Sequence, residues 1–433
     1  MAEIHKRTRV YLYEMSCLTV NSFRAAFRNI TAFPRTFRNS LEFTIYQNIK
    51  DVPKKTWESL NGDKSIFLSI PLLEALSASQ YASSKFFFAV FKENNKAVGI
   101  SVFQVAELVA DNLHDRLDNS SIAGMIGKHF TGAENGRFML VCGSAFATGE
   151  HGYYFDPAIP TQRAMNSLCE VLTNILKQLD EEKQEISAVL IKDFYENKFP
   201  EAKAMEKCGF RSFNVDHNMV MPILKEWNTF ESYLDSLNSK FRTKAKAAFK
   251  RSEILRVEEL NAEQIEQHAA LIQELYNNVH DRADFKIGHL DVAIFACMKR
   301  SLASKLIFKG YFNEEIMIGF SIALDGETGL EAFLVGIDYA VNAELALYSR
   351  MLYDYIDLGI SRKKPKIIFG RTAGEIKSTV GAFPVDLKCC IRHPGRLPNV
   401  FLNLIFKYVE PSPFPIRNPY KETTLLSIQQ QQA

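Results

Sequence analysis

The sequence has no hydrophobic run long enough to cross a bilayer. Its longest apolar stretches, 86–91 and 400–406, fall far short of the roughly 20 residues that a transmembrane helix needs, and they suit buried strands or a short helix. A secretory signal is missing too, because Arg24 and Arg28 interrupt any apolar segment near the N-terminus. We therefore expect a cytoplasmic protein without a transmembrane segment.

Cysteine is sparse and irregularly placed. The seven cysteines are odd in number and follow no regular spacing, which favours reduced thiols over a disulfide framework. Cys389 and Cys390 are neighbours in an expected strand, so their side chains point to opposite faces. Two histidines and two aspartates gather in 280–289, but their spacing matches no standard zinc site, and no metal is expected.

Several enzyme signatures are also absent. The chain has no Walker phosphate-binding loop, no Rossmann glycine fingerprint and no Gly-x-Ser-x-Gly nucleophile elbow. It lacks a strong charge of one sign, since the net charge is +2. The one asymmetry is a basic leader, residues 1–40, with seven Lys or Arg against two Glu. A peripheral contact of this leader with acidic lipid or RNA stays open, although solvated terminal charge is the simpler interpretation.

What the chain does contain is an ordinary globular composition, 47% apolar and 24% charged. Its 433 residues exceed what one hydrophobic core normally supports, so two domains are expected. The predicted parts are the leader 1–40, a first domain 41–225, a second domain 226–405 and a Pro/Gln-rich tail 406–433. Within the tail, the proline-rich part 411–419 and the polar end 429–432 are expected to be disordered.

The clearest structural pattern lies between Gly329 and Pro384. It predicts a strand over 330–337, a helix over 344–358 that stops at Gly359, and a second strand over 366–369. Two strands joined by such a helix are normally parallel neighbours. Open α/β sheets bind ligands beyond the carboxyl ends of their strands, so the exit loop 370–378 is a candidate ligand site.

The residues of this exit loop suit an anionic ligand. Arg371 offers a planar fork for carboxylate or phosphate, Lys377 offers a point charge, and Gly370 allows close backbone approach. Thr372 lies among them and joins the same candidate substrate-binding set. A solvated turn is the alternative interpretation.

The two halves of the chain share an order of elements. The first half predicts a hairpin, a strand, a glycine-bearing loop, a long helix, a strand and a closing hairpin; these are placed at 86–105, 138–142, 143–152, 160–180, 187–191 and around 216–218. The second half predicts a basic helix over 231–252 and a hairpin over 305–324, followed by the unit described above. No sequence identity links the halves, so the repeat is topological.

This order of hairpin, strand, helix and strand resembles the GCN5-related N-acetyltransferase (GNAT) fold. Its tandem occurrence resembles the FemAB-like group of double-GNAT acyltransferases. The resemblance is carried by YLDSLNSKFR at 233–242, IMIGFS at 316–321 and GRTAGEIKS at 370–378, and in the first half by IFLS at 66–69 and TGEHGYYFD at 148–156. It implies an α/β protein of two tandem GNAT-like domains that transfers an acyl or aminoacyl group to an amine.

The same resemblance implies acyl-CoA or an aminoacyl-tRNA as the donor. GNAT enzymes that use acetyl-CoA typically carry an Arg/Gln-x-x-Gly-x-Gly/Ala loop that cradles the pyrophosphate at a helix N-terminus. The corresponding segments here, 156–160 and 336–342, do not match that loop. The coiled-coil arm of the tRNA-dependent members has no counterpart. We expect small-molecule substrates, and aminoacyl-tRNA is the one nucleic acid that fits as a donor substrate.

Acyl transfer to an amine needs a base for the amine proton and groups that orient both substrates. Glu150 and His151 lie in a glycine-flanked loop and are candidates for the base, with a loop salt bridge or a hydrogen-bonded histidine as the alternative. Asp338 is a third catalytic candidate, although its position also suits a helix N-cap. Candidate substrate-binding residues in the second half are Arg282, Phe285, Tyr339 and Tyr348, and for Arg282 helix capping is the alternative.

Two classes of function therefore stay open. The leading hypothesis is a GNAT-like N-acyltransferase, and the alternative is a non-catalytic protein of the same fold that binds a small anion or a partner. A third option is RNA or membrane-surface binding through the leader and the basic residues of 240–251.

Overall fold

The computed structural model describes residues 39–62, 65–78, 84–109, 138–282, 286–287, 290–394 and 414–432. In the first half the elements are β1 (Glu42–Tyr46), α2 (Lys54–Asn61), α3 (Ile70–Ala78), β2 (Phe86–Glu93), β3 (Lys96–Val109), β4 (Phe138–Cys142), β5 (Tyr153–Phe155), α6 (Thr161–Glu181), β6 (Ile186–Phe194), α7 (Phe199–Glu206) and β7 (Arg211–Pro222). Of the earlier expectations, those for 1–38, Phe285 and 395–413 lie outside the described residues.

The second half begins after β7. Its elements are α8 (Phe230–Ser236), α9 (Ser239–Arg251), β8 (Arg256–Glu259), α10 (Ala262–Gln267), α11 (Ala269–His280), β9 (Lys286–Ile287), α12 (Ala293–Leu302), β10 (Leu306–Asn313), β11 (Ile316–Asp325), β12 (Leu330–Ile337), α13 (Tyr339–Leu345), α14 (Leu347–Ser361), β13 (Lys366–Ile368), α15 (Gly374–Thr379), β14 (Phe383–Arg392) and α17 (Glu422–Gln432).

One mixed sheet runs through both halves, in the order β1-β2-β3-β4-β6-β14-β7-β13-β12-β11-β10-β8. The pairs β4–β6 and β12–β13 are parallel, and the other neighbours along this path are antiparallel. Each half thus repeats a hairpin followed by a parallel strand pair, with a long helix between the parallel strands. The predicted repeat and the predicted βαβ unit are both present.

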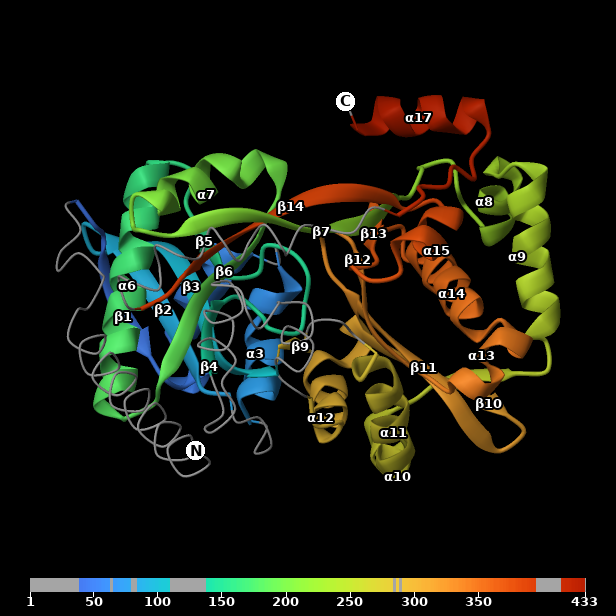
Figure 1. Cartoon of the computed structure of the whole chain (residues 1–433), viewed down its shortest axis with the longest axis horizontal. Helices are drawn as coiled ribbons and strands as arrows, with labels where there is room; N and C mark the ends of the chain where they lie inside the picture. The colour runs from blue at the N-terminus through green and yellow to red at the C-terminus, as the bar shows by residue number, and fades with distance from the viewer. Residues whose placement is uncertain are drawn as a thin grey trace, which may run out of the picture.

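Two long strands join the halves. β14 lies between β6 and β7, and β7 pairs with β14 on one side and with β13 on the other. Figure 1 shows both strands running across the top of the molecule from one half to the other. The predicted boundaries assign β14 to the second half, yet it completes the sheet of the first.

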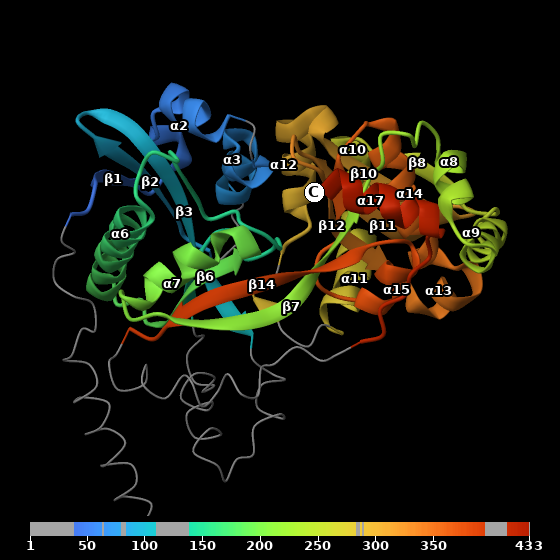
Figure 2. The ribbon, with the colours of Figure 1, turned by 90° about the horizontal axis from the view of Figure 1, so that it is seen from above.

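The halves also share a hydrophobic core. Trp57 and Leu73 of the first half belong to the same buried cluster as Phe295 and Met298 of the second. Helix α3 packs against α12 at this place, and Figure 2 shows the two facing each other. The junction between the halves is therefore a packed interior, which can hold polar groups away from solvent.

The parallel pair of the second half opens at its carboxyl end. β12 and β13 pair only through Leu330–Ile367 and Glu331–Ile368, while β12 continues to Ile337. A bulge falls at Phe333, because Ala332 pairs with Ala323 and Leu334 with Ile322. Beyond Glu331, the β13 side of β12 has no strand partner among the described residues.

Two predictions about turns were wrong. The hairpin expected around 216–218 does not exist, because β7 runs straight through it and pairs with 383–391 of β14. Its polar residues Asn214 and Asp216 are exposed at alternating positions, as on the open face of a strand. Gly359 does not end its helix either: α14 continues to Ser361, and a Cβ at Gly359 would lie 2.9 Å from the Ile367 side chain.

Two predictions about continuity were also wrong. The basic helix expected over 231–252 is broken into α8 and α9 at Leu237, whose backbone forms a bridge with Tyr420. The tail segments 411–419 and 429–432 were expected to be disordered, but their described residues, 414–419 and 429–432, belong to an ordered stretch 414–432 in which 422–432 form helix α17. Tyr420 explains both results, because its buried ring stacks on Trp227 and Phe383 and holds the segment against the second half.

No helix in the described ranges combines the length and the apolar character that spanning a bilayer requires.

Candidate functional site

Two loops from different halves meet beside the opening between β12 and β13. The loop 143–152 follows β4, and the exit loop 370–373 follows β13. A Cβ at Gly370 would lie 3.9 Å from Thr148 Oγ1, and Gly370 has a φ of +76°, which favours glycine. The structure thus brings Glu150 and His151 into one region with Gly370 and Arg371.

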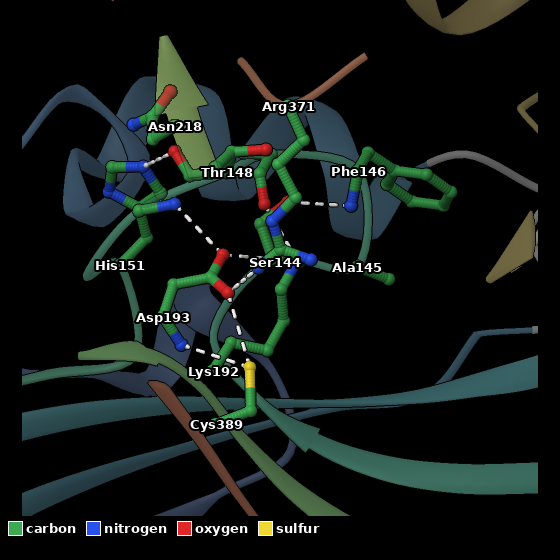
Figure 3. Close-up of polar contacts among 12 residues, drawn as sticks. Ser144, Ala145, Phe146, Thr148, His151, Lys192, Asp193, Asn218, Arg371 and Cys389 are labelled. Atoms are coloured by element: carbon green, nitrogen blue, oxygen red, sulfur yellow. Dashed lines mark hydrogen bonds and ion pairs between the residues drawn. The ribbon is translucent and has the colours of Figure 1, made fainter. Parts of the chain in front are cut away.

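An ion-pair cluster of Lys192, Asp193 and Arg371 ties these loops together. Asp193 is fully buried at the end of β6 and forms an ion pair with Arg371 of the other half. Its second oxygen accepts a hydrogen bond of 2.9 Å from Gly149 N, and Cys389 Sγ donates to the carboxylate at 3.3 Å. Figure 3 shows the Asp193 carboxylate between Arg371 and Cys389. Asp193 has a φ of +63°, a left-handed conformation that costs free energy for a non-glycine residue and is common at functional sites.

Lys192 adds a second cation to the cluster. Its Nζ donates to Ser144 O at 2.9 Å and to Ala147 O at 2.7 Å, and it lies 3.8 Å from Asp193. Burial, together with the nearby Arg371 charge, lowers the pKa of Lys192 to about 7. Burial also lowers the pKa of Arg371. Arg371, expected to bind an anionic substrate, is paired with a protein carboxylate, and its role in substrate binding stays a prediction.

A second group of polar residues lies next to this cluster, and we call Glu150, Tyr195, Asn218 and Glu331 the junction site. Glu150 Oε1 accepts a hydrogen bond of 2.8 Å from Tyr195 N, and Asn218 Nδ2 donates to the Tyr195 hydroxyl at 2.7 Å. Burial raises the pKa of Glu150 to about 7, and the hydrogen bond from Tyr195 opposes that shift. Burial, followed by the charge of Glu331, raises the pKa of Tyr195. The charges of Glu331 and Glu150 both act on the Tyr195 hydroxyl, which is therefore the electrostatic neighbour of each carboxyl group.

Glu331 occupies the point where β12 and β13 part. It is the last residue of β12 that pairs with β13, and its side chain is half-buried. Burial raises the pKa of Glu331 to about 8, with Lys366 acting in the opposite direction. Within the described part of the chain, its carboxyl group makes no hydrogen bond or ion pair. A group of this kind is suited to accept and release a proton near neutral pH.

His151 has both ring nitrogens engaged. Nε2 lies 3.0 Å from Thr148 O and must donate to it, which leaves Nδ1 to accept from Ser65 Oγ at 3.3 Å. The ring packs on Phe67 with centroids 4.1 Å apart, and burial lowers the pKa of His151 to about 3. The imidazole is therefore neutral and forms a wall of the region together with Phe67 and Phe333.

The other predicted residues lie in separate places. Asp338 caps α13, accepting a hydrogen bond of 2.9 Å from Ala340 N, and the Arg282 guanidinium lies 3.6 Å from the centre of the Tyr339 ring. Tyr348 belongs to the next helix, α14, and its backbone N donates to Asn342 Oδ1 at 2.9 Å. These four candidates surround the start of α13 and α14, whereas the junction site lies at the opposite end of β12.

Lys377 and Thr372 are the remaining candidates in 370–378. This segment was expected to be a loop throughout, but 374–379 form helix α15, and Lys377 lies in that helix. The buried Lys377 Nζ donates to Phe369 O at 2.6 Å and to Gly370 O at 3.3 Å, so it holds the end of β13 from within. Burial lowers the pKa of Lys377 to about 7. Thr372 is exposed.

Sequence reasoning did not find Lys192, Asp193, Tyr195, Asn218 or Glu331. Glu331 interrupts the apolar strand LEAFLVGI, and Lys192 and Asp193 follow the apolar run ISAVLI. The sequence signal that could have identified these residues is a charged residue inside or directly after an apolar strand. Burying an ionisable group without a compensating partner costs free energy, so such a residue calls for an explanation.

Comparison with known proteins identifies the fold. No family model and no curated protein sequence matches the chain. Among solved structures, a tandem GNAT protein from the clavulanic acid biosynthesis pathway aligns with a TM-score of 0.50 at 8% identity, covering 82% of this chain and 99% of that one. The chain has the tandem GNAT fold. The predicted α/β architecture of two tandem GNAT-like units is thereby confirmed.

Two further structures align over similar lengths. FemX gives a TM-score of 0.47 at 11% identity, covering 84% of this chain and all of FemX. L-PGS from Bacillus licheniformis gives 0.43 at 11% identity, covering 83% of this chain and 98% of that one. At such identities the likeness concerns the fold, and the activity has to be argued from the residues of this chain.

Proposed function

We propose that this protein is an acyltransferase that moves an acyl or aminoacyl group onto an amine at the junction site. The observation that supports this most directly is Glu331, a half-buried carboxyl group at the opening of the β12–β13 pair that has no hydrogen-bond or ion-pair partner among the described residues. N-acylation requires a group that removes a proton from the attacking nitrogen. Glu331 has the position and the raised pKa for that role, and Glu150 is a second carboxyl group whose charge acts on the same Tyr195 hydroxyl.

The proposed chemistry assigns each group one task. The ionised Glu331 takes one proton from the bound ammonium, which frees the nitrogen lone pair to attack the acyl carbonyl carbon. The N–C bond forms, and the bond from the acyl carbon to the leaving atom of the donor breaks. The second nitrogen proton passes to the leaving group by way of the Tyr195 hydroxyl, whose own hydrogen has no acceptor among the described residues.

The donor is acyl-CoA or an aminoacyl carrier in this proposal, but the helix N-termini do not fit a pyrophosphate. At α13 the Asp338 carboxylate already accepts from Ala340 N, so an anion there would meet a like charge. Before α6, Asp156 accepts from Ala158 N, and two prolines remove donor amides. We therefore assign no donor phosphate to either helix.

The test is transfer activity in an E331Q variant. Purified protein is offered acetyl-CoA or aminoacyl-tRNA with a panel of amines, and the acylated amine is measured by mass spectrometry. Loss of the base should lower kcat/KM by about 10²- to 10⁴-fold. In the wild type, kcat/KM should rise with pH up to about 8, as Glu331 becomes ionised, and this rise should vanish in E331Q.

The matched control is E327Q, which neutralises an exposed glutamate four residues before Glu331. Its activity should equal that of the wild type. Full activity of E331Q, with an unchanged pH profile, would contradict the assignment.

The second candidate is a non-catalytic protein that keeps the fold and binds a small ligand. It is favoured by the Asp338 carboxylate, which caps α13 and would repel a donor pyrophosphate there. A thermal-shift screen with acyl-CoAs, amino acids and amines separates the two functions. Stabilisation by an acyl donor supports the enzyme, whereas stabilisation by other ligands alone, without turnover, supports the binding protein.

A further inference from the structure

Helix α9 carries positive charge that nothing within the helix balances. Its 13 residues, SKFRTKAKAAFKR, include six Lys or Arg and no Asp or Glu. Cations in the last turn of a helix are favoured by its dipole, but Lys240, Lys244 and Lys246 all precede that turn. Helix formation therefore gives no reason for these three charges.

The cations of α9 lie mostly on the side of the helix that faces away from the core. Ala245 and Ala248 are buried, and Phe241 and Phe249 pack against the core of the second half. Figures 1 and 2 both show α9 at the outer edge of that half. Five cations occupy exposed positions, and we call them the basic face: Lys240, Lys244, Lys246, Lys250 and Arg251.

Neighbouring cations of the basic face repel one another. Lys240 and Lys244 are four positions apart, and so are Lys246 and Lys250. Side chains of like charge at this spacing destabilise a helix. None of these four lysines forms an ion pair within the described ranges. An anionic partner would remove the repulsion.

The carboxylates at the ends of α9 do not balance this charge. Asp235, before the helix, lies 3.5 Å from Arg242, which is outside the basic face. Glu253 and Glu344 are exposed beside the C-terminal end, where Arg251 Nε donates to Glu344 O at 2.7 Å. The lysines in the middle of the basic face therefore remain available to a partner.

A surface hollow of about 390 Å³ separates α9 from α15. The residues that line it are Lys244, Ala373, Glu375, Ile376 and Thr379. The carboxylate among them, Glu375, lies 2.7 Å from Arg417 and is thereby neutralised. Lys244 thus stands beside a hollow that can receive an anionic group.

Two exposed isoleucines flank the basic face. Ile254 follows the end of α9 and is 61% exposed, and Ile416, next to Arg417, is 58% exposed. Aliphatic side chains beside lysines suit a bilayer, because they can enter it while the ammonium groups contact phosphates. Single-stranded RNA is bound instead by exposed aromatic rings, whereas Phe241 and Phe249 pack against the core. The surroundings of the basic face therefore favour lipid over RNA.

We propose that the basic face of α9 docks the protein on an anionic phospholipid surface, with its lysines at the headgroup phosphates and Ile254 entering the interface. Charge complementarity is the basis, since a cluster of about four to eight Lys or Arg on one helix is typical of binding to acidic lipids. This inference goes beyond the proposed acyl transfer and does not depend on it.

The experiment measures co-sedimentation of the full chain with vesicles. One set contains equal parts of phosphatidylglycerol and phosphatidylcholine, and the other contains phosphatidylcholine alone. We expect binding to the first set and none to the second. Added sodium chloride should weaken the binding steeply, because it screens the attraction.

The decisive variant is K244Q/K246Q/K250Q. Each lysine at an anionic surface contributes about fivefold in affinity, so this variant should bind about 10²-fold more weakly. The matched control is K55Q/K203Q/K207Q, which removes the same charge from exposed lysines of the first half and should bind as the wild type. Circular dichroism verifies that both variants fold.

I254S tests the apolar part of the contact. It should weaken vesicle binding at every salt concentration and leave the salt dependence unchanged, because it removes burial and no charge. A single-stranded RNA serves as the competing polyanion. The inference is overturned if the anionic vesicles do not bind, if the two triple variants bind equally well, or if RNA binds more tightly than the vesicles and I254S affects neither.

Discussion

At the residue scale, Asp193 balances two cations, Lys192 and Arg371, inside the protein. Taking charges out of water is costly, and here the one buried carboxylate compensates part of that cost. Asp193 also joins the loops of the two halves, because it accepts from Gly149 N while pairing with Arg371. Arg371 therefore affects the junction site indirectly, because its ion pair with Asp193 helps to hold the loop 143–152 that carries Glu150.

The D193N variant tests this role. It leaves Arg371 without its counter-ion, and we expect the free energy of unfolding to fall by about 3–5 kcal/mol, measured by urea denaturation. The control is D235N, which removes an exposed partner of Arg242 at 3.5 Å and should cost less than about 1 kcal/mol. Equal effects of the two variants would show that the buried cluster has no special part in stability.

Sequence reasoning reached part of this site. Glu150 and Gly370 could be found because both lie in glycine-bearing loops after predicted strands, where ligands commonly bind. Glu331, Asn218 and Asp193 could not be assigned in this way. Their importance comes from strand pairings such as Glu331–Ile368 and from the contact of Asp193 with Arg371, both between segments distant in sequence.

At the element scale, the C-terminal segment is fastened to the second half through Tyr420. The ring lies between Trp227 and Phe383, with centroids 6.0 and 6.1 Å away, and the hydroxyl donates to Gly381 O at 3.1 Å. Leu237, at the break between α8 and α9, forms a backbone bridge with the same residue. One residue therefore anchors α17 through its side chain and stabilises the break through its backbone.

Y420A should lower the free energy of unfolding by about 3–5 kcal/mol, because it leaves a cavity the size of an aromatic ring. Y420F keeps the ring and removes only the hydrogen bond to Gly381, so it should cost about 1 kcal/mol. Urea denaturation measures both values. A loss in Y420F as large as that in Y420A would assign the anchoring to the hydroxyl and contradict the packing argument.

The sequence pattern predicted most elements of the second half because their hydrophobic periods are regular. It failed for β7 and for the C-terminal segment, whose conformations depend on distant partners. The polar run 214–218 has the composition of a turn, and its pairing with β14 makes it a strand. The segment 414–432 is polar and proline-containing, and the aromatic pocket around Tyr420 orders it.

At the scale of the whole molecule, we propose that the units 41–225 and 226–405 are topological repeats that do not fold independently. Their sheets are continuous through β7 and β14, and a single core includes helices from both. Residues 1–225 alone lack β14, so the facing edges of β6 and β7 would lose their partner. Exposed strand edges of this length promote aggregation.

A fragment of residues 1–225 should therefore be insoluble or lack cooperative unfolding, while the full chain gives a sharp transition. Circular dichroism and size-exclusion chromatography report both properties. Supplying a peptide of residues 381–394 in trans should recover soluble fragment. A fragment that is monomeric and cooperatively folded without the peptide would establish 41–225 as an autonomous domain.

The position of β14 also sets the order in which the protein is completed during its synthesis on the ribosome. Asp193 of β6 and its hydrogen-bond partner Cys389 of β14 are 196 positions apart in the sequence. The first half emerges first, yet the strand that fills its sheet is made only after nearly all of the second half. Contacts so distant in sequence form slowly. The edges of β6 and β7 therefore stay open throughout that interval, and the nascent chain needs protection there until residue 392 has been made.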